Sequence, residues 1–194
     1  MKKKKVVEIP SVSQMETELR RAKYKKQYWR VLRSTIYILV IVAAVAVLVA
    51  TLWLPVLQIY GDSMTPTLEE NDIVVSIKSQ NYKQGDIIAF YYNNKILVKR
   101  VIASSGQWID IDKDGTVYVD GEEIEEPYVT EKAFGDCNIK LPYQVPESRI
   151  FVMGDHRSTS IDSRNVSVGC IAEEQIVGRI VFQIWPLPCI GMVQ

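Results

Sequence analysis

The stretch IIAFYYNNKILVKRVI, residues 87–102, decides the fold class of the chain. It holds two apolar runs on either side of Asn93-Asn94. Asn tolerates the positive φ angles that a two-residue hairpin turn requires. The stretch therefore predicts two antiparallel strands joined by a tight turn.

The pattern of the following sequence is also that of β structure. WIDIDKDGTVYVDGEEI (108–124) alternates apolar and polar residues around Asp-Gly pairs, which predicts a second hairpin and a further turn. RIFVMGD (149–155) and QIVGRIVFQIW (175–185) are further strand candidates, and the proline-containing region 126–148 predicts a long loop. No stretch after residue 55 has a helical period of useful length. We expect one all-β domain of partly closed antiparallel sheets.

A run without charge precedes this domain, from Ser34 to Tyr60. Its central part, TIYILVIVAAVAVLVATLWL (35–54), is long enough as a helix to span about 30 Å, the thickness of a bilayer core. A buried core helix would be expected to have a polar face. A cleaved signal peptide would have a shorter basic region and a cleavage motif at its polar end. We therefore expect a retained transmembrane anchor that Pro55 ends.

Charge is distributed unevenly along the chain, and the predicted parts are a tail (1–33), an anchor (34–55) and a domain (56–194). The tail has eleven Lys/Arg and three Asp/Glu, whereas the rest has twelve and twenty. The positive-inside rule places the tail in the cytoplasm and the domain outside. An acidic domain argues against a nucleic-acid partner. The tail residues 15–33 would form either a basic amphipathic helix on the membrane or, as the charge run favours, a solvated extension.

Lys99 lies in the second strand of the first hairpin, on the same face as Leu97 and Val101. If that face is inside, desolvation favours the neutral amine, and a neutral lysine is a base. Alternatively Lys99 lies at a sheet edge, or its stem lies flat and its charge reaches water, and the strand by itself favours these alternatives.

Two other segments contain residues that could take part in catalysis or support a catalytic site. GDSMTPT (61–67) offers Ser63 as a nucleophile whose backbone amide is a candidate oxyanion donor, although a plain turn explains the segment equally simply. GDHRSTSIDSR (154–164) follows an apolar strand and is either an exposed loop or a hydrogen-bond network that supports a site.

Together these segments resemble bacterial type I signal peptidases. The resemblance covers nearly the whole chain, through GDSMTPTL, QGDIIAF (84–90), KRVIASSG (99–106), TVYVDGEEIEEPYV (116–129), FVMGDHRSTSIDSR (151–164) and VGRIVFQIWPL (177–187). It implies an all-β catalytic domain outside the membrane, a single N-terminal anchor, and a Ser/Lys dyad that uses no metal or organic cofactor.

The resemblance also implies a role for each matching residue. Ser63 is similar to the nucleophile, and Lys99 to the general base that activates it. The remaining matches are supporting residues (Ser160, Asp162, Arg164, Arg100 and Asp155) and residues of a shallow apolar substrate pocket (Ile59, Met64, Leu68 and Val98).

Three positions depart from the family pattern. Gly61 stands where some members have a serine whose hydroxyl is the second oxyanion donor, which leaves that donor open. His156 replaces the usual Asn, and Ala103-Ser104-Ser105-Gly106 replaces a stretch similar to Gly-Leu-Pro-Gly. The last two affect the expected loop shapes but not the dyad.

The implied function is a membrane-bound serine endopeptidase that removes N-terminal signal peptides. Its expected partners are signal peptides of secreted preproteins, the lipid bilayer and the secretion translocon. Only nine residues separate Leu54 from Ser63, at most about 30 Å of extended chain, so the nucleophile would work near the membrane face.

Three other functions stay open at this stage. His156, the only histidine, could be the base of a Ser/His protease, whose activity would rise at about pH 6 to 7. A specialised peptidase for one pilin or coat precursor would keep the dyad and cut few preproteins. A non-enzymatic membrane-anchored binding domain would be insensitive to the loss of Ser63.

The cysteines do not identify a further site. Cys137, Cys170 and Cys189 have no C-x-x-C spacing, and with a single histidine they argue against a zinc site. One disulfide with one thiol, or three free thiols, are both compatible with the sequence.

Overall fold

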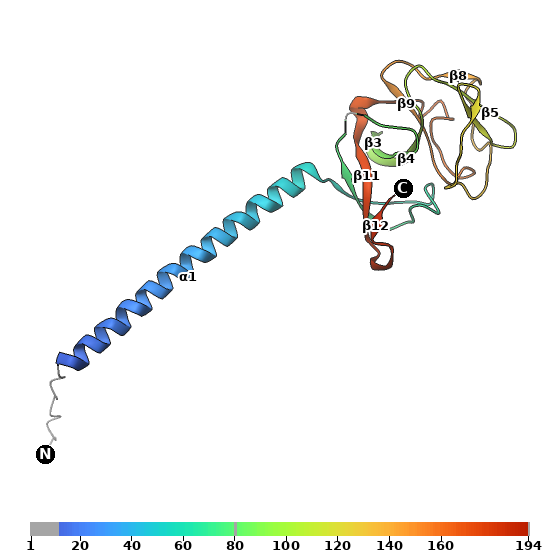
Figure 1. Cartoon of the computed structure of the whole chain (residues 1–194). Coiled ribbons are helices and arrows are strands. Elements are labelled where there is room, and N and C mark those ends of the chain that lie inside the picture. The colour runs from blue at the N-terminus through green and yellow to red at the C-terminus, as the bar shows by residue number, and fades with distance from the viewer. Residues whose placement is uncertain (1–11, 80, 194) are drawn as a thin grey trace. The chain divides into compact units, whose positions relative to one another are not determined.

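The computed structural model describes residues 12–79 and 81–193, which form two compact units, residues 1–49 and 50–194. The first eleven residues of the predicted tail lie outside the described part. One α-helix, α1 (Val12–Trp53), precedes the strands (Figure 1). These are β1 (Val56–Gln58), β2 (Ile73–Ile77), β3 (Ile87–Tyr92), β4 (Lys95–Ala103), β5 (Trp108–Ile111), β6 (Val117–Val119), β7 (Glu122–Glu123), β8 (Tyr143–Gln144), β9 (Arg149–Met153), β10 (Ile171–Ala172), β11 (Ile176–Trp185) and β12 (Gly191–Met192). Two 3-10 turns, η1 (Glu173–Gln175) and η2 (Leu187–Cys189), flank β11.

Helix α1 includes both the basic tail from Val12 onwards and the apolar run. An 18-residue window of the helix reaches a mean hydropathy of 2.4, and none of that window is buried within the chain. A core helix of a globular domain would be covered by other elements. By length and composition the helix is therefore long and apolar enough to cross a membrane.

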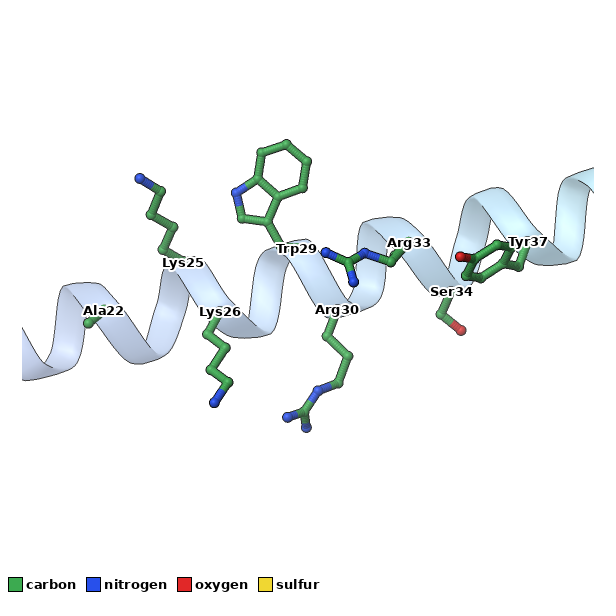
Figure 2. A pocket seen from close by; sticks show the side chains of 8 residues that line it. All are labelled: Ala22, Lys25, Lys26, Trp29, Arg30, Arg33, Ser34 and Tyr37. Carbon is green, nitrogen blue, oxygen red and sulfur yellow. The ribbon is translucent and has the colours of Figure 1, made fainter.

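Basic and aromatic side chains surround α1 where the apolar run begins. Figure 2 shows Lys25 and Trp29 extending to one side of the helix and Lys26, Arg30 and Ser34 to the other. They line a shallow hollow together with Ala22, Arg33 and Tyr37. All of its lining belongs to one helix, so its walls are rotatable side chains, and we assign it no ligand. The arrangement matches the interfacial anchors that flank membrane spans.

The larger sheet of the second unit has the strand order β1-β2-β11-β3-β4-β9-β10, with β12 also paired to β11. Strands β3 and β4 are antiparallel, and Ile88 pairs with Lys99. Asn93 and Asn94 join them with φ angles of 44° and 64°, as the first hairpin requires. The predicted hairpin is confirmed, and so are the strands predicted at 149–155 and 175–185.

The smaller sheet has the order β7-β6-β5-β8. In Figure 1, β5 and β8 lie apart from β3, β4 and β11. Strands β5 and β6 form the second predicted hairpin, and β7 follows β6 after the Asp120-Gly121 turn. The fold is therefore the expected set of mostly antiparallel sheets behind one apolar helix. The region 126–148 contains only the two-residue strand β8, so it is largely the long loop that its prolines predict.

Strand β4 lies between two apolar clusters, and this position sets the surroundings of Lys99. Val98 packs against a cluster that contains Ile59, Met64 and Leu68. Leu97 packs against a second cluster on the opposite face, in which Val101 is fully buried. Since Lys99 shares the face of Leu97 and Val101, its stem enters the interior of the domain.

Candidate active site

Ser63 lies in a tight turn that follows β1. The Thr65 amide donates to Asp62 O at 3.1 Å, and the Leu68 amide donates to Met64 O at 3.0 Å. Met64 and Leu68 are almost fully buried in the cluster beneath Val98. These two apolar side chains fix the turn to the core and leave Ser63 half-buried at its surface.

Lys99 reaches Ser63 from β4. Its side chain is buried, with 3% of the residue exposed, and its Nζ lies 2.5 Å from Ser63 Oγ. Burial lowers the pKa of Lys99 to about 8, against the opposing charges of Asp162, Asp155 and Asp62. A large fraction of the amine is therefore neutral near pH 8, as a base for a serine hydroxyl needs to be. The alternative in which the charge of Lys99 reaches water is wrong, because the side chain is buried.

Asp162 and Arg164 form a fully buried ion pair in the loop 154–164. Arg164 Nε donates to Asp162 Oδ1 at 2.8 Å, and Nη2 donates to Oδ2 at 2.9 Å. Burial by itself would raise the pKa of Asp162, but the Arg164 hydrogen bonds and charge hold it below its ordinary value, aided by the Gly154 amide. The pair thus stays charged and fixes the loop that faces Lys99.

A second buried pair joins Arg100, the neighbour of Lys99, to Asp155. Arg100 Nε donates to Oδ1 at 2.9 Å, and Nη2 donates to Oδ2 at 2.7 Å. Thr67 Oγ1 also donates to Asp155 Oδ2, at 2.5 Å. The pair therefore connects β4, the loop 154–164 and the segment that follows Ser63.

Two residues of this network are not among the predicted site residues, although both lie in the segment 116–129 that carries part of the resemblance. The ring of Tyr128 lies over the Arg100 guanidinium, with 3.8 Å between Cζ and the ring centroid, and burial raises the pKa of its hydroxyl. Glu126 forms a buried ion pair with Arg157. Both Glu126 and Tyr128 come from the loop 126–148, and nothing in their local pattern indicates that they cover the site.

Ser160 and Gly154 lie directly behind Ser63. A Cβ atom at Gly154 would lie 2.3 Å from Ser160 Oγ and 2.4 Å from Ser63 O, so only glycine fits there. Ser160 Oγ is buried and makes no hydrogen bond within the part of the chain that the structure describes. No hydrogen bond therefore joins the Ser160 hydroxyl to the Lys99 amine among the described residues.

His156 is close to the turn of Ser63 but not to its hydroxyl. The His156 amide donates to Ser63 O at 3.1 Å. Its Nδ1 lies 3.1 Å from Thr65 Oγ1 and 3.8 Å from Asp62 Oδ2. Among the described residues, no hydrogen bond joins the imidazole to Ser63 Oγ, whose partner is Lys99.

A groove of about 780 Å³ opens beside the Ser63–Lys99 pair. Its lining consists of Val56, Leu57, Gln58, Ile59, Tyr60, Gly61, Ser63, Met64, Lys95, Ile96, Leu97, Val98 and Lys99. Of the four predicted pocket residues, Ile59, Met64 and Val98 line it, while Leu68 is buried in the cluster beneath. Most of the lining is apolar, and the two reactive groups lie at its wall.

The structure describes the backbone at Gly61 and the state of the three cysteines. Gly61 has a φ angle of 82° and no other atom within 4 Å of the position of a Cβ, so a side chain there would have space but a strained backbone. All three cysteines are free: Cys170 is buried, Cys137 is partly buried and Cys189 is exposed.

Comparisons with known proteins agree with this geometry. Residues 32–185 match the family described as "Signal peptidase, peptidase S26". Signal peptidase I T of Bacillus subtilis (strain 168) is 37% identical over 139 residues, 65% of this chain and 71% of that protein. Signal peptidase I of Bacillus amyloliquefaciens is 34% identical over 161 residues, 76% of this chain and 82% of that protein.

Among solved structures, a crystal structure of a signal peptidase I from Enterococcus faecalis V583 is 26% identical, with a TM-score of 0.44 over 52% of this chain and 97% of that one. The family match spans most of the chain, and the two Bacillus relatives are covered over more than two thirds of their length. The chain therefore belongs to the signal peptidase family, peptidase S26.

Proposed function

We propose that this chain cuts N-terminal signal peptides from secreted preproteins with Ser63 as the nucleophile and Lys99 as the general base. Its class is that of a serine endopeptidase, a hydrolase that acts as signal peptidase I. One observation carries the assignment of the dyad: a buried lysine amine lies 2.5 Å from the hydroxyl of Ser63.

The reaction follows from this pair. Neutral Lys99 takes the proton of Ser63 Oγ while the oxygen attacks the scissile carbonyl carbon, which gives a tetrahedral oxyanion. The oxyanion collapses, the C–N bond breaks, and protonated Lys99 gives its proton to the leaving amine. Lys99 then deprotonates a water molecule that attacks the acyl-enzyme ester, and returns this proton to Ser63 Oγ as the ester C–O bond breaks and the acid product leaves. The Ser63 amide is the proposed first oxyanion donor.

The groove has the form needed for an extended peptide. Strand β9 pairs with β4 only from Arg100 to Ala103, so residues 95–99 of β4 keep a free edge in the described chain. Strand β1 pairs with β2, and both β1 and residues 95–99 line the groove. A peptide in extended conformation can use these main-chain groups and place a small residue against Ile59, Met64 and Val98.

The buried residues around the dyad have positioning roles in this proposal. The ion pair Asp162–Arg164 lies within the loop 154–164 and fixes its shape, whereas Arg100–Asp155 and the Thr67 hydrogen bond hold that loop and the segment 63–67 against β4. Ser160, whose buried hydroxyl makes no hydrogen bond among the described residues, would hold the Lys99 amine when a substrate is bound.

The proposed location is a membrane, with the N-terminus in the cytoplasm and residues 56–194 outside. The apolar run in α1 supports the anchor, and the basic side chains before it support the orientation. Membrane lipids and the secretion translocon are the proposed partners, because a preprotein emerges at that face of the bilayer.

The first experiment uses purified full-length protein in detergent and a mixed set of preproteins. We expect wild type to cut several of them after small residues, as mass spectrometry of the new N-termini will show. Ser63→Ala should cut none, whereas Ser167→Ala, a change at an exposed serine remote from the dyad in sequence, should cut like wild type.

Other results would point to the remaining hypotheses. Cleavage of a single precursor type would indicate a specialised processing peptidase. Cleavage that survives Ser63→Ala would contradict the proposed nucleophile.

A further inference from the structure

The segment Gly154–His156 packs against the backbone of the nucleophile turn. The His156 amide donates to Ser63 O, and the His156 carbonyl accepts from the Ser160 amide at 3.1 Å. The main chain of His156 is therefore fixed on both sides, independently of its side chain. The imidazole, which is 36% exposed, lies beside the turn.

The single proton of the Thr65 hydroxyl assigns the tautomer of the His156 imidazole. Thr65 Oγ1 donates its single proton to Asp62 O at 2.8 Å. At 3.1 Å from His156 Nδ1, the same oxygen can then only accept, so Nδ1 carries a proton. The carboxylate of Asp62, 3.8 Å away, favours that protonated nitrogen. Protonation of Nε2 would leave this contact intact.

These contacts join His156 to the turn on both sides of Ser63 in the sequence. His156 touches Thr65, Asp62 and the carbonyl of Ser63, while the Ser63 hydroxyl points to Lys99. We propose that His156 is a positioning residue, which donates Nδ1–H to Thr65 and so holds the turn in the orientation that keeps Ser63 Oγ beside the Lys99 amine. The inference rests on the proposed dyad and assigns a role to the residue that departs from the family pattern.

The chemistry needed from residue 156 is a single side-chain donor. An asparagine amide offers one at a similar distance from the backbone, whereas alanine offers none. His156→Asn should therefore keep the function that His156→Ala loses. A histidine that moved protons would not be replaced by an amide.

The test measures kcat and KM of full-length His156→Ala, His156→Asn and Thr65→Val for one preprotein, with the melting temperature of each. We expect His156→Ala to lower kcat about fivefold, the usual size for one neutral hydrogen bond, with KM and melting temperature unchanged. His156→Asn should stay within about twofold of wild type. The alkaline rise of kcat/KM should keep its midpoint in all of them, because Lys99 sets it.

A double-mutant cycle shows whether the contact to Thr65 is the one that matters. His156→Ala in a Thr65→Val background should not lower kcat any further, because the acceptor of the hydrogen bond, Thr65 Oγ1, is already absent. Additive losses would overturn the proposal, and so would wild-type kcat in His156→Ala or equal losses in His156→Ala and His156→Asn. None of these results bears on the Ser63 and Lys99 variants, which test the dyad separately.

Discussion

Lys99 is buried between aliphatic side chains of β4, and the pH dependence of activity follows from that burial. Only the neutral amine can accept the Ser63 proton, and burial lowers the pKa of Lys99 to about 8. We expect kcat/KM to rise with pH and to reach half its plateau at about pH 8. A steady-state pH profile measures this directly. A midpoint near pH 10.5, the ordinary value for lysine, would show that the amine is solvated in the working enzyme.

The burial of the Lys99 amine also lowers the stability of the folded state. The folded state must keep a charged amine out of water below about pH 8, whereas the unfolded chain keeps its proton up to about pH 10.5. Between these two values the unfolded state binds more protons, so the stability of wild type should increase with pH.

Lys99→Met should remove this cost along with the activity. We expect about 1 to 3 kcal/mol more stability at pH 7, and no rise in stability between pH 8 and 10.5. Denaturant unfolding of the detergent-solubilised chain measures both, with Ser63→Ala as the inactive control. Equal stability of the two variants would contradict a desolvated amine.

At the scale of elements, the loop 154–164 is packed against the nucleophile turn without space for another atom. A Cβ at Gly154 would lie 2.3 to 2.4 Å from Ser160 Oγ and Ser63 O, so Gly154→Ala must displace one of them. We expect kcat to fall by more than about tenfold, as small misplacements of reacting groups do. Gly191→Ala is the matched control, since no atom lies within 4 Å there. Equal activity of the two variants would show that the turn tolerates displacement.

The ion pairs of the molecule differ in burial, and therefore in their contribution to the free energy of unfolding. Asp162→Asn leaves the buried Arg164 guanidinium without its carboxylate, and we expect a loss of about 3 to 5 kcal/mol in the free energy of unfolding. Lys132→Met breaks a pair with Glu123 that is open to solvent, and should leave the melting temperature unchanged. Thermal unfolding of both variants makes the comparison, and similar melting temperatures would argue against a structural role of Asp162.

Interactions between residues close in the sequence can be predicted from it, whereas contacts between distant residues cannot. The Asn93-Asn94 turn and the alternation of β5 are local, so the sequence indicates both hairpins. Tyr128 over Arg100 and Glu126 with Arg157 are contacts between residues distant in the chain. Tyr128 and Glu126 lie in the segment 116–129 that carries part of the family resemblance, but no pattern around either residue indicates its partner. The burial of Lys99 is only partly predictable. The alternation along its strand predicts the face of the sheet on which Lys99 lies, but only the two apolar clusters in the structure show that this face is buried.

At the scale of the whole molecule, the anchor determines where the reaction takes place. Cys189 is an exposed free thiol of the catalytic unit, and Ser13 lies in α1 before the apolar run. We expect a membrane-impermeant maleimide to label Cys189 on intact cells. A Cys189→Ser chain carrying Ser13→Cys should be labelled only after lysis. Labelling in the opposite order would reverse the proposed orientation.

The central claim is that a lysine, and not the single histidine, activates Ser63. The most direct measurement compares the cleavage rate of one preprotein by wild type, Lys99→Ala and His156→Ala under the same conditions. The Ser63–Lys99 distance of 2.5 Å predicts that Lys99→Ala cuts nothing detectable, whereas His156→Ala stays within about tenfold of wild type. Activity that survives in Lys99→Ala and disappears in His156→Ala would contradict the claim.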